Sequence, residues 1–183
     1  MTKKTTVILI LIVVTLLVAA VATYKVVQKN KNTINEETKE IFSSESKDFT
    51  YTDINGNEVS LEQYLGKILV VTSWASWSPF SKNDLVDLDD LASNYSQSEV
   101  VFIAINRKET KEMAERYMNT LPDLDNILIV LDPSDHFYTA VSGYAMPETV
   151  VFDTKGEVVL HVNGVVKTKD IKDEIEILTK NPT

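Results

Sequence analysis

The sequence predicts an α/β domain with a mostly parallel central sheet, helices on both faces and one membrane-spanning helix before it. Apolar, β-branched runs alternate with stretches of helical periodicity along most of the chain, which is typical of strands joined by crossover helices. Apolar residues make up 44% of the sequence, and glycine and proline number only five each, as in folded domains. The first 24 residues include a long run without charge.

Residues 1–24 are predicted to form a signal anchor. The run from Val7 to Ala22 carries no charge. As a helix, the segment from Thr5 to Tyr24 would measure about 30 Å, the thickness of the hydrocarbon core of a bilayer. Lys3 and Lys4 favour a cytoplasmic N-terminus. We therefore expect a single-pass membrane protein whose folded domain lies outside the cytoplasm.

A cleaved signal peptide is the alternative for the same segment. Ala20-Val21-Ala22 fits a small-x-small cleavage site, and cleavage there would give a secreted domain. The length of the apolar run favours the anchor. Residues 25–47 are polar and are predicted to be a flexible stalk, which leaves residues 48–183 for the domain.

Charge and cysteine content exclude several classes of function. After residue 24 the chain carries 16 basic and 27 acidic residues, a formal charge of −11, so a nucleic-acid partner is not expected. The sequence contains no cysteine, which excludes disulfides, thiolate catalysis and metal sites with cysteine ligands.

The first half of the domain contains two predicted strands before the longest apolar run. Residues 49–54 alternate as a strand, and 55–57 (Asn-Gly-Asn) form a hairpin turn toward a short second strand. Ser60 is expected to cap a short helix that ends before Gly66. The run 68–74 is nearly continuously apolar and rich in β-branched residues, as expected for a strand buried on both faces.

The second half alternates helices and strands and ends in a hairpin and a last helix. In the predicted helix 109–118, Met113 and Tyr117 are expected to face inward. The predicted helices cover residues 79–95, 109–118, 133–141 and 169–178. The predicted strands cover residues 100–105, 127–131, 149–152 and 157–162.

Four local features of this chain resemble one known family. Residues 74–81 read Trp-Ala-Ser-Trp-Ser-Pro-Phe-Ser, and residues 131–134 read Leu-Asp-Pro-Ser. Residues 144–153 read Tyr-Ala-Met-Pro-Glu-Thr-Val-Val-Phe-Asp. Together with the helix that follows the octapeptide, these resemble the TlpA/ResA-like membrane-anchored thioredoxin-fold family, over roughly residues 48–179.

The resemblance implies a thioredoxin-like fold, with a central mixed sheet and the helix-strand insert of TlpA-type proteins. Ser78 and Ser81 stand where the family has its two redox cysteines. Asp84 stands where many relatives carry a glutamate that helps proton transfer. Pro147 matches the proline that is cis in this fold and lies beside the active site.

The two serines fit a structural role. A serine hydroxyl stays protonated and carries no thiol-disulfide exchange. Ser78 suits the N-cap of the following helix, and Pro79 suits its first position. Ser81 can accept a hydrogen bond from another free N–H group of the first turn. A serine nucleophile would need a base, and neither His136 nor His161 is expected beside Ser78.

Metal binding and enzyme activity receive little support from the acidic residues of this helix. Asp84, Asp87, Asp89 and Asp90 are mostly expected on a solvated face, although Asp87 and Asp90 have the spacing to share a hard cation. No metal site and no cofactor is predicted. A cryptic serine- or metal-dependent enzyme is kept as the weakest alternative.

The aromatic residues around the serines indicate binding. Side chains at this place in the fold would flank an extended cis-proline segment and hold a peptide through apolar contacts and main-chain hydrogen bonds. The predicted groove consists of Trp77, Pro79, Phe80, Tyr144, Met146 and Pro147. We therefore expect a non-catalytic protein-binding, chaperone or assembly module. The alternative is a role in extracytoplasmic redox homeostasis or protein maturation through a cysteine-bearing partner.

Overall fold

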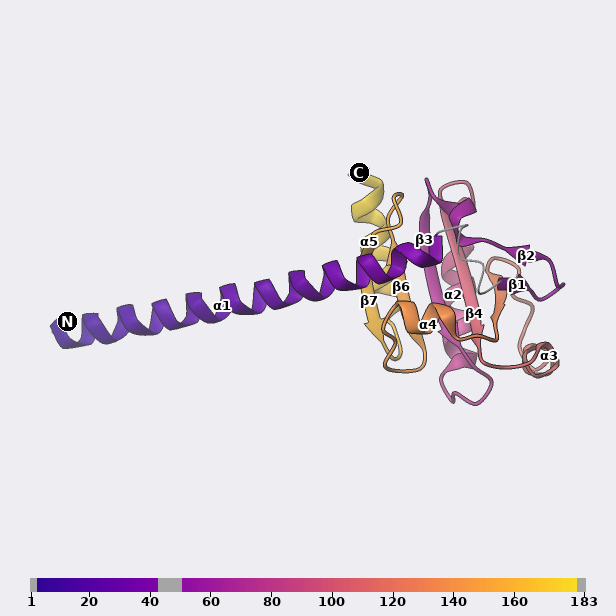
Figure 1. Ribbon diagram of the computed structural model, residues 1–183, viewed down its shortest axis with the longest axis horizontal. Helices are drawn as coiled ribbons and strands as arrows, with labels where there is room; N and C mark the ends of the chain where they lie inside the picture. Colours follow the sequence, from indigo (N-terminus) through magenta and orange to yellow (C-terminus); the bar gives the residue numbers. More distant parts are fainter. Residues whose placement is uncertain (1–2, 43–50, 181–183) are drawn as a thin grey trace. The chain divides into compact units, whose positions relative to one another are not determined.

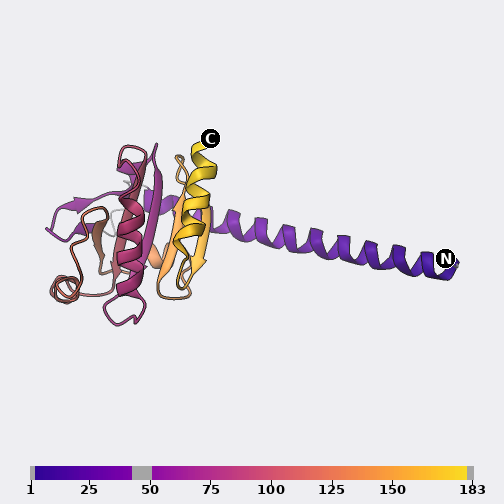
Figure 2. The ribbon, with the colours of Figure 1, turned by 180° about the vertical axis from the view of Figure 1, so that it is seen from behind.

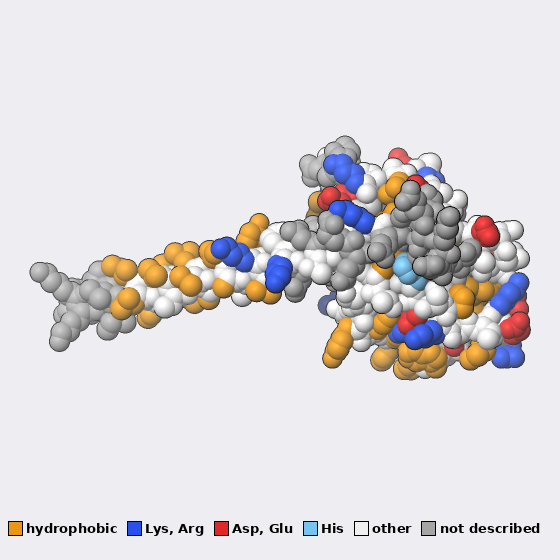
Figure 3. Space-filling view, in the orientation of Figure 1, with side chains coloured by type: hydrophobic (Ala, Val, Ile, Leu, Met, Phe, Trp, Pro, Cys, Tyr) orange, Lys and Arg blue, Asp and Glu red, His pale blue; other side chains and the backbone are white. Residues whose placement is uncertain are grey.

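The N-terminal helix is long and apolar. The computed structural model describes residues 3–42 and 51–180, and helix α1 covers Lys3–Thr38. Within it, Ile10–Lys29 is long and apolar enough to cross a membrane, and its side chains are exposed. This segment is a candidate membrane anchor or signal sequence, and Figure 3 shows hydrophobic side chains along it.

The chain divides into two compact units, residues 1–34 and 35–183. The second unit includes the last turn of α1 and the 3-10 helix η1 (Lys39–Phe42). Thr38, Ile41 and Phe42 are buried, and the Phe42 ring meets the Phe152 ring edge-on at 5.1 Å between centroids. The expectation of a flexible stalk is therefore wrong for residues 35–42, because these apolar side chains pack on the sheet. Residues 43–47 of the predicted stalk lie outside the described residues.

One seven-stranded mixed sheet forms the centre of the domain (Figure 1). The strand order is β2-β1-β5-β4-β3-β6-β7. Strands β3, β4 and β5 are parallel, while β1, β2, β6 and β7 pair antiparallel with their neighbours. The strands are β1 (Tyr51–Asp53), β2 (Glu58–Val59), β3 (Ile68–Trp74), β4 (Val100–Arg107), β5 (Leu128–Asp132), β6 (Glu148–Phe152) and β7 (Val158–Asn163).

Helices cover both faces of the sheet, as predicted. Figure 2 shows α2 (Ser81–Ala92) and α5 (Thr168–Lys180) side by side on one face, where they contact each other. Helix α4 (His136–Ala140) contacts η1 on the other face. The remaining elements are the 3-10 helix η2 (Leu61–Tyr64) and helix α3 (Lys111–Met118). This arrangement is the predicted thioredoxin-like α/β fold.

Two helix predictions need correction. Helix α2 begins at Ser81 rather than Pro79, because the Ser78 carbonyl accepts the Ser81 N–H at 3.3 Å and a turn precedes the helix. In α3, Met113 is 40% exposed and Ala114 is the buried residue, since Thr110 caps the helix and sets its face.

Candidate functional site

Two loops meet at the end of the sheet that carries the octapeptide. Strand β3 ends at Trp74, and β6 begins at Glu148, which pairs with Ser73. The loop after β3 and the loop before β6 therefore leave the sheet side by side, and both lie along the lower edge of the domain in Figure 1. We call them the serine loop (residues 75–80) and the proline loop (residues 142–147).

The two serines are buried and do not cap the helix as predicted. Ser78 is 3% exposed, and its hydroxyl has no hydrogen-bond partner among the described residues. The Ser81 Oγ accepts the Ala75 N–H at 3.3 Å and so closes the serine loop. The residue at the N-cap of α2 is Phe80, which makes no side-chain cap. The capping interpretation of Ser78 is wrong, because the helix begins two residues later than a Ser78 cap requires.

Asp84 is one of the buried acidic groups of the site. It is 6% exposed, and its Oδ2 atom has no hydrogen-bond partner among the described residues. Burial raises the pKa of Asp84 to about 7, repulsion from Asp87 adds to the rise, and a hydrogen bond from the Val166 backbone opposes it. This carboxyl therefore changes protonation near neutral pH, as a proton-transfer group would.

Asp89 also differs from its predicted place on a solvated face. It is 7% exposed, and its carboxylate accepts the Asn126 N–H at 2.7 Å and the Asn126 side-chain amide at 2.9 Å. Asp87 and Asp90 are exposed. In the part of the chain that the structure describes, no group of three or more His, Asp or Glu residues could hold a metal ion.

A second buried carboxylate, Glu109, fixes the serine loop. It accepts the Ser76 N–H at 2.8 Å, the Ser76 hydroxyl at 2.5 Å and the Asn106 amide at 2.7 Å. Behind the loop, the buried Trp74 ring stacks on Tyr117 with 5.5 Å between centroids. These hydrogen bonds and the ring stacking hold the serine loop in place.

Aromatic side chains project from the serine loop and the proline loop into solvent. Trp77 is 62% exposed, Phe80 52% and Tyr144 88%, and Pro79 beside them is also exposed. Figure 3 shows hydrophobic side chains gathered along the lower edge of the domain. We call Trp77, Phe80 and Tyr144 the aromatic rim. Large exposed aromatic groups on adjoining loops are typical of interaction surfaces.

The other predicted groove residues lie in the proline loop. The Met146–Pro147 bond is cis, as the resemblance implied. Met146 is half-buried and Pro147 is buried. The exposed Val165 joins this end of the domain, because Gly164 donates to the Pro147 carbonyl at 2.8 Å.

Sequence reasoning missed Glu148, which is fully buried directly after Pro147. Its carboxylate binds His161, Asn163 and two backbone N–H groups of the proline loop. The signal in the sequence is weak, because its side-chain partners lie 13 and 15 residues away. In the described residues, the His161 hydrogen bond goes to Glu148, and neither serine hydroxyl bonds a histidine. Among the described residues, therefore, no histidine is hydrogen-bonded to either serine as a base for a nucleophile would be.

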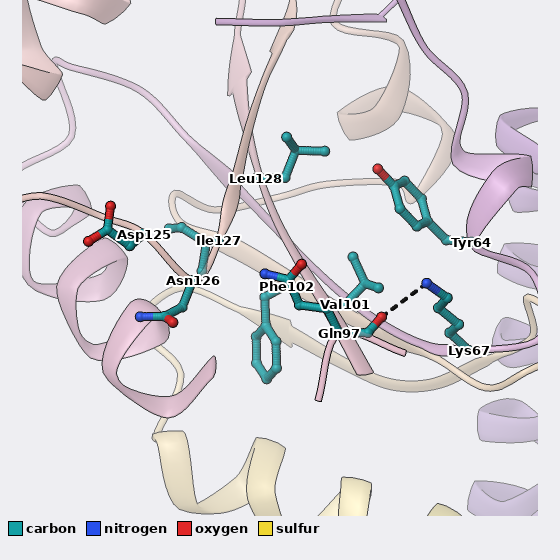
Figure 4. Close-up of a pocket in the computed structure, with 9 residues that line it drawn as sticks. All are labelled: Tyr64, Lys67, Gln97, Val101, Phe102, Asp125, Asn126, Ile127 and Leu128. Atoms are coloured by element: carbon teal, nitrogen blue, oxygen red, sulfur yellow. Dashed lines mark hydrogen bonds between the residues drawn. The ribbon is translucent and has the colours of Figure 1, made fainter. Parts of the chain in front are cut away.

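A pocket of about 310 Å³ lies elsewhere, where β3, β4 and β5 begin (Figure 4). Lys67 donates to the Gln97 carbonyl at 3.0 Å at its edge, and Tyr64 and Leu128 also line it. None of the predicted site residues lines this pocket. The predicted residues instead gather on the two loops described above.

Comparison with known proteins supports the family. Residues 43–177 match the family model described as Redoxin. A thiol-disulfide oxidoreductase ResA from Geobacillus kaustophilus (strain HTA426) is 29% identical over 149 residues, which cover 79% of this chain and 82% of that protein. The thiol-disulfide oxidoreductase ResA from Geobacillus thermodenitrificans (strain NG80-2) is 28% identical with the same coverage.

Solved structures support the fold. The pneumococcal exposed lipoprotein thioredoxin from Streptococcus pneumoniae strain TIGR4 aligns with a TM-score of 0.63 at 21% identity, covering 71% of this chain and 98% of that one. A secreted Mycobacterium tuberculosis disulfide oxidoreductase homologous to E. coli DsbE aligns with a TM-score of 0.60 at 18% identity, covering 74% and 100%. The chain belongs to the Redoxin family, with the thioredoxin-like fold of its TlpA/ResA-type relatives and no cysteine to carry thiol chemistry.

Proposed function

We propose that this domain is a non-catalytic binding module that holds an extended, apolar segment of a protein or peptide on the aromatic rim. The observation that carries the proposal is the contrast between exposed aromatic groups on the two loops and the buried hydroxyls of Ser78 and Ser81. Trp77, Phe80 and Tyr144 face solvent, whereas Ser78 and Ser81 do not. The surface is thus built for contact rather than for chemistry at the serines.

The family relationship supports this proposal. The curated relatives are named thiol-disulfide oxidoreductases, and an enzyme that exchanges thiols with a protein must also hold that protein. This chain lacks the thiols but keeps a rigid serine loop and a cis proline beside it. Tyr and Trp are side chains that contribute strongly to protein interfaces at low entropic cost.

The test uses the full chain in lipid nanodiscs and a phage library of random 12-residue peptides. We expect wild-type protein to select apolar peptides whose affinity falls about 10-fold or more in Trp77→Ala and Phe80→Ala variants. Leu65→Ala is the matched control, because Leu65 is 42% exposed but lies at the sheet end where β3 begins. Equal affinity in all four proteins would refute the binding surface, as would insulin reduction by the wild-type chain.

We also propose that α1 remains attached and anchors the domain on the extracytoplasmic side of a membrane. The apolar stretch Ile10–Lys29 and the positive residues before it support this placement. Expressed with a C-terminal tag, the protein should stay in the membrane fraction after alkaline carbonate washing, and the tag should be digested by external protease. Release of the domain as a soluble fragment would instead indicate cleavage near Ala22.

A further inference from the structure

Glu148 joins the proline loop to the edge strand of the sheet. The side chain is fully buried, and its Oε2 atom accepts the N–H groups of Tyr144 at 3.2 Å and Ala145 at 3.0 Å. Its Oε1 atom accepts hydrogen bonds from His161 Nε2 and Asn163 Nδ2, both on β7. Four donors thus surround a single carboxylate, and two of them belong to the loop backbone.

The same loop is held from its other side by Tyr138 of α4. The Tyr138 hydroxyl donates to the Ala145 carbonyl at 3.1 Å. Its ring lies against the loop backbone, since a Cβ atom at Gly143 would come within 2.5 Å of it. The Arg107 guanidinium lies 3.5 Å from the ring centroid and binds the Asp135 carboxylate through two hydrogen bonds of 2.7 and 2.5 Å.

The peptide groups on both sides of Ala145 are therefore fixed, one through its N–H and one through its carbonyl. Tyr144 donates its own N–H to Glu148, so its backbone is held while its side chain is 88% exposed. A buried ionised group costs free energy unless it is fully paired, so we expect a carboxylate placed here to have a function that offsets this cost. Fixing the backbone that carries an exposed aromatic group is one such function, because a partner then loses less entropy on binding.

We infer that Glu148 and Tyr138 are positioning residues that hold Tyr144 as a preformed anchor for the bound peptide. The inference rests on the proposed function and assigns the specificity of the rim to Tyr144. Glu148 is the principal brace, since it bonds two backbone groups of the loop. Tyr138 is the secondary brace, since it bonds one.

Two measurements on the full chain in nanodiscs test this inference. The first is amide hydrogen exchange at Tyr144 and Ala145, which needs no ligand. We expect Glu148→Ala to accelerate exchange at both amides about 100-fold or more, because each loses its acceptor. We expect Tyr138→Phe to have a smaller effect, and Asp89→Ala, the matched loss of a buried paired carboxylate elsewhere, to have none.

The second measurement is affinity for a peptide selected as described above. Tyr144→Ala and Glu148→Ala should each weaken binding about 10-fold, and their combination should weaken it no further, since Glu148 acts through Tyr144. Glu148→Gln should restore binding. Its carbonyl oxygen can accept the loop N–H groups, while its amide can donate to His161 and Asn163 after a tautomer change and an amide flip.

The outcomes separate the two proposals. If the Tyr144 and Ala145 amides stay protected from exchange in folded Glu148→Ala, Glu148 does not hold the proline loop. This result would overturn the inference whether or not the protein binds peptides. Additive losses in the Glu148–Tyr144 pair would reduce Glu148 to a general structural role. Loss of binding in Trp77→Ala with full binding in Tyr144→Ala would overturn the anchor but leave the proposed function. If Glu148→Ala does not fold, exchange and affinity in Tyr138→Phe decide. Unchanged values in Tyr138→Phe would overturn the inference.

Discussion

Two of the buried carboxyl groups in the site, Asp84 and Glu148, differ in how completely they are hydrogen-bonded. Asp84, on the serine side, has an oxygen without a hydrogen-bond partner among the described residues, and its pKa is raised to about 7. Glu148, on the proline side, is more deeply buried but is surrounded by four donors. Burial alone therefore does not decide what a carboxyl group does here; the supply of donors does.

The difference indicates that Asp84 and Glu148 suit different roles. A buried, poorly paired acid near neutral pKa suits proton transfer to a neighbouring nucleophile. With serine at positions 78 and 81, Asp84 has no thiol to serve and only destabilises the domain when ionised. Glu148 needs no thiol, because its role is to hold the loop that carries Tyr144.

Restoring both cysteines should have the largest effect, because it gives Asp84 a chemical role. Ser78→Cys with Ser81→Cys should change the protein from no detectable thiol-disulfide exchange to a measurable rate of insulin reduction. Adding Asp84→Asn should then lower that rate about 100-fold, the usual contribution of a general acid or base. An equal rate with aspartate or asparagine would show that Asp84 does not serve the restored thiols.

Removing the paired carboxylate should cause the largest loss of stability. Glu148→Ala leaves four donors without their acceptor, so we expect a loss of about 3 kcal/mol in the free energy of unfolding. Urea denaturation of the variant measures this loss. Asp89→Ala should lose about half as much, since its carboxylate accepts two hydrogen bonds. A Glu148→Ala variant as stable as wild type would mean that the four contacts contribute nothing.

Asp84 should instead make the domain less stable as pH rises. Its folded pKa of about 7 lies above the ordinary value of 3.8, so the folded state binds the extra proton between these values. The free energy of unfolding should fall as pH increases through this window, by roughly 2–4 kcal/mol in total. Asp84→Asn should therefore be more stable than wild type at pH 8 and nearly equal to it at pH 4.

Denaturation at both pH values checks this sign. Asp90→Asn is the matched control, because Asp90 is exposed on the same helix, and it should leave the pH profile unchanged. Asp87→Asn should reduce the effect without abolishing it, since repulsion from Asp87 is the second cause of the raised pKa. If the free energy of unfolding rose between pH 4 and pH 7 in wild type but not in Asp84→Asn, the assignment would be contradicted.

The sequence predicts the strands of this domain better than its site. Strand Ile68–Trp74 is predictable residue for residue, because a short, nearly continuous run of apolar and β-branched residues favours a buried strand. The start of α2 is not, since the turn at Ser78 depends on a backbone hydrogen bond that no side chain encodes. Local patterns reveal an amphipathic face but not the turn geometry before it.

Long-range partners explain the other differences. The sequence predicts Asp89 as a solvated acid. In the structure, Asn126, 37 residues away in sequence, donates two hydrogen bonds to its carboxylate. Glu148 likewise depends on His161 and Asn163, which only the β6–β7 register brings beside it. The exposed aromatic groups are predictable in place but not in exposure, because the fixed backbone of the proline loop decides how far Tyr144 projects.

The smallest expected effects come from the serines, and they should have opposite signs. The buried Ser78 hydroxyl has no partner among the described residues, so Ser78→Ala should stabilise the domain by roughly 1 kcal/mol. The Ser81 hydroxyl accepts the Ala75 N–H, so Ser81→Ala should destabilise it by about 1 kcal/mol. Paired denaturation curves resolve this contrast. If both variants lose stability equally, the Ser78 hydroxyl has a partner of its own, and the serine side is as well paired as the proline side.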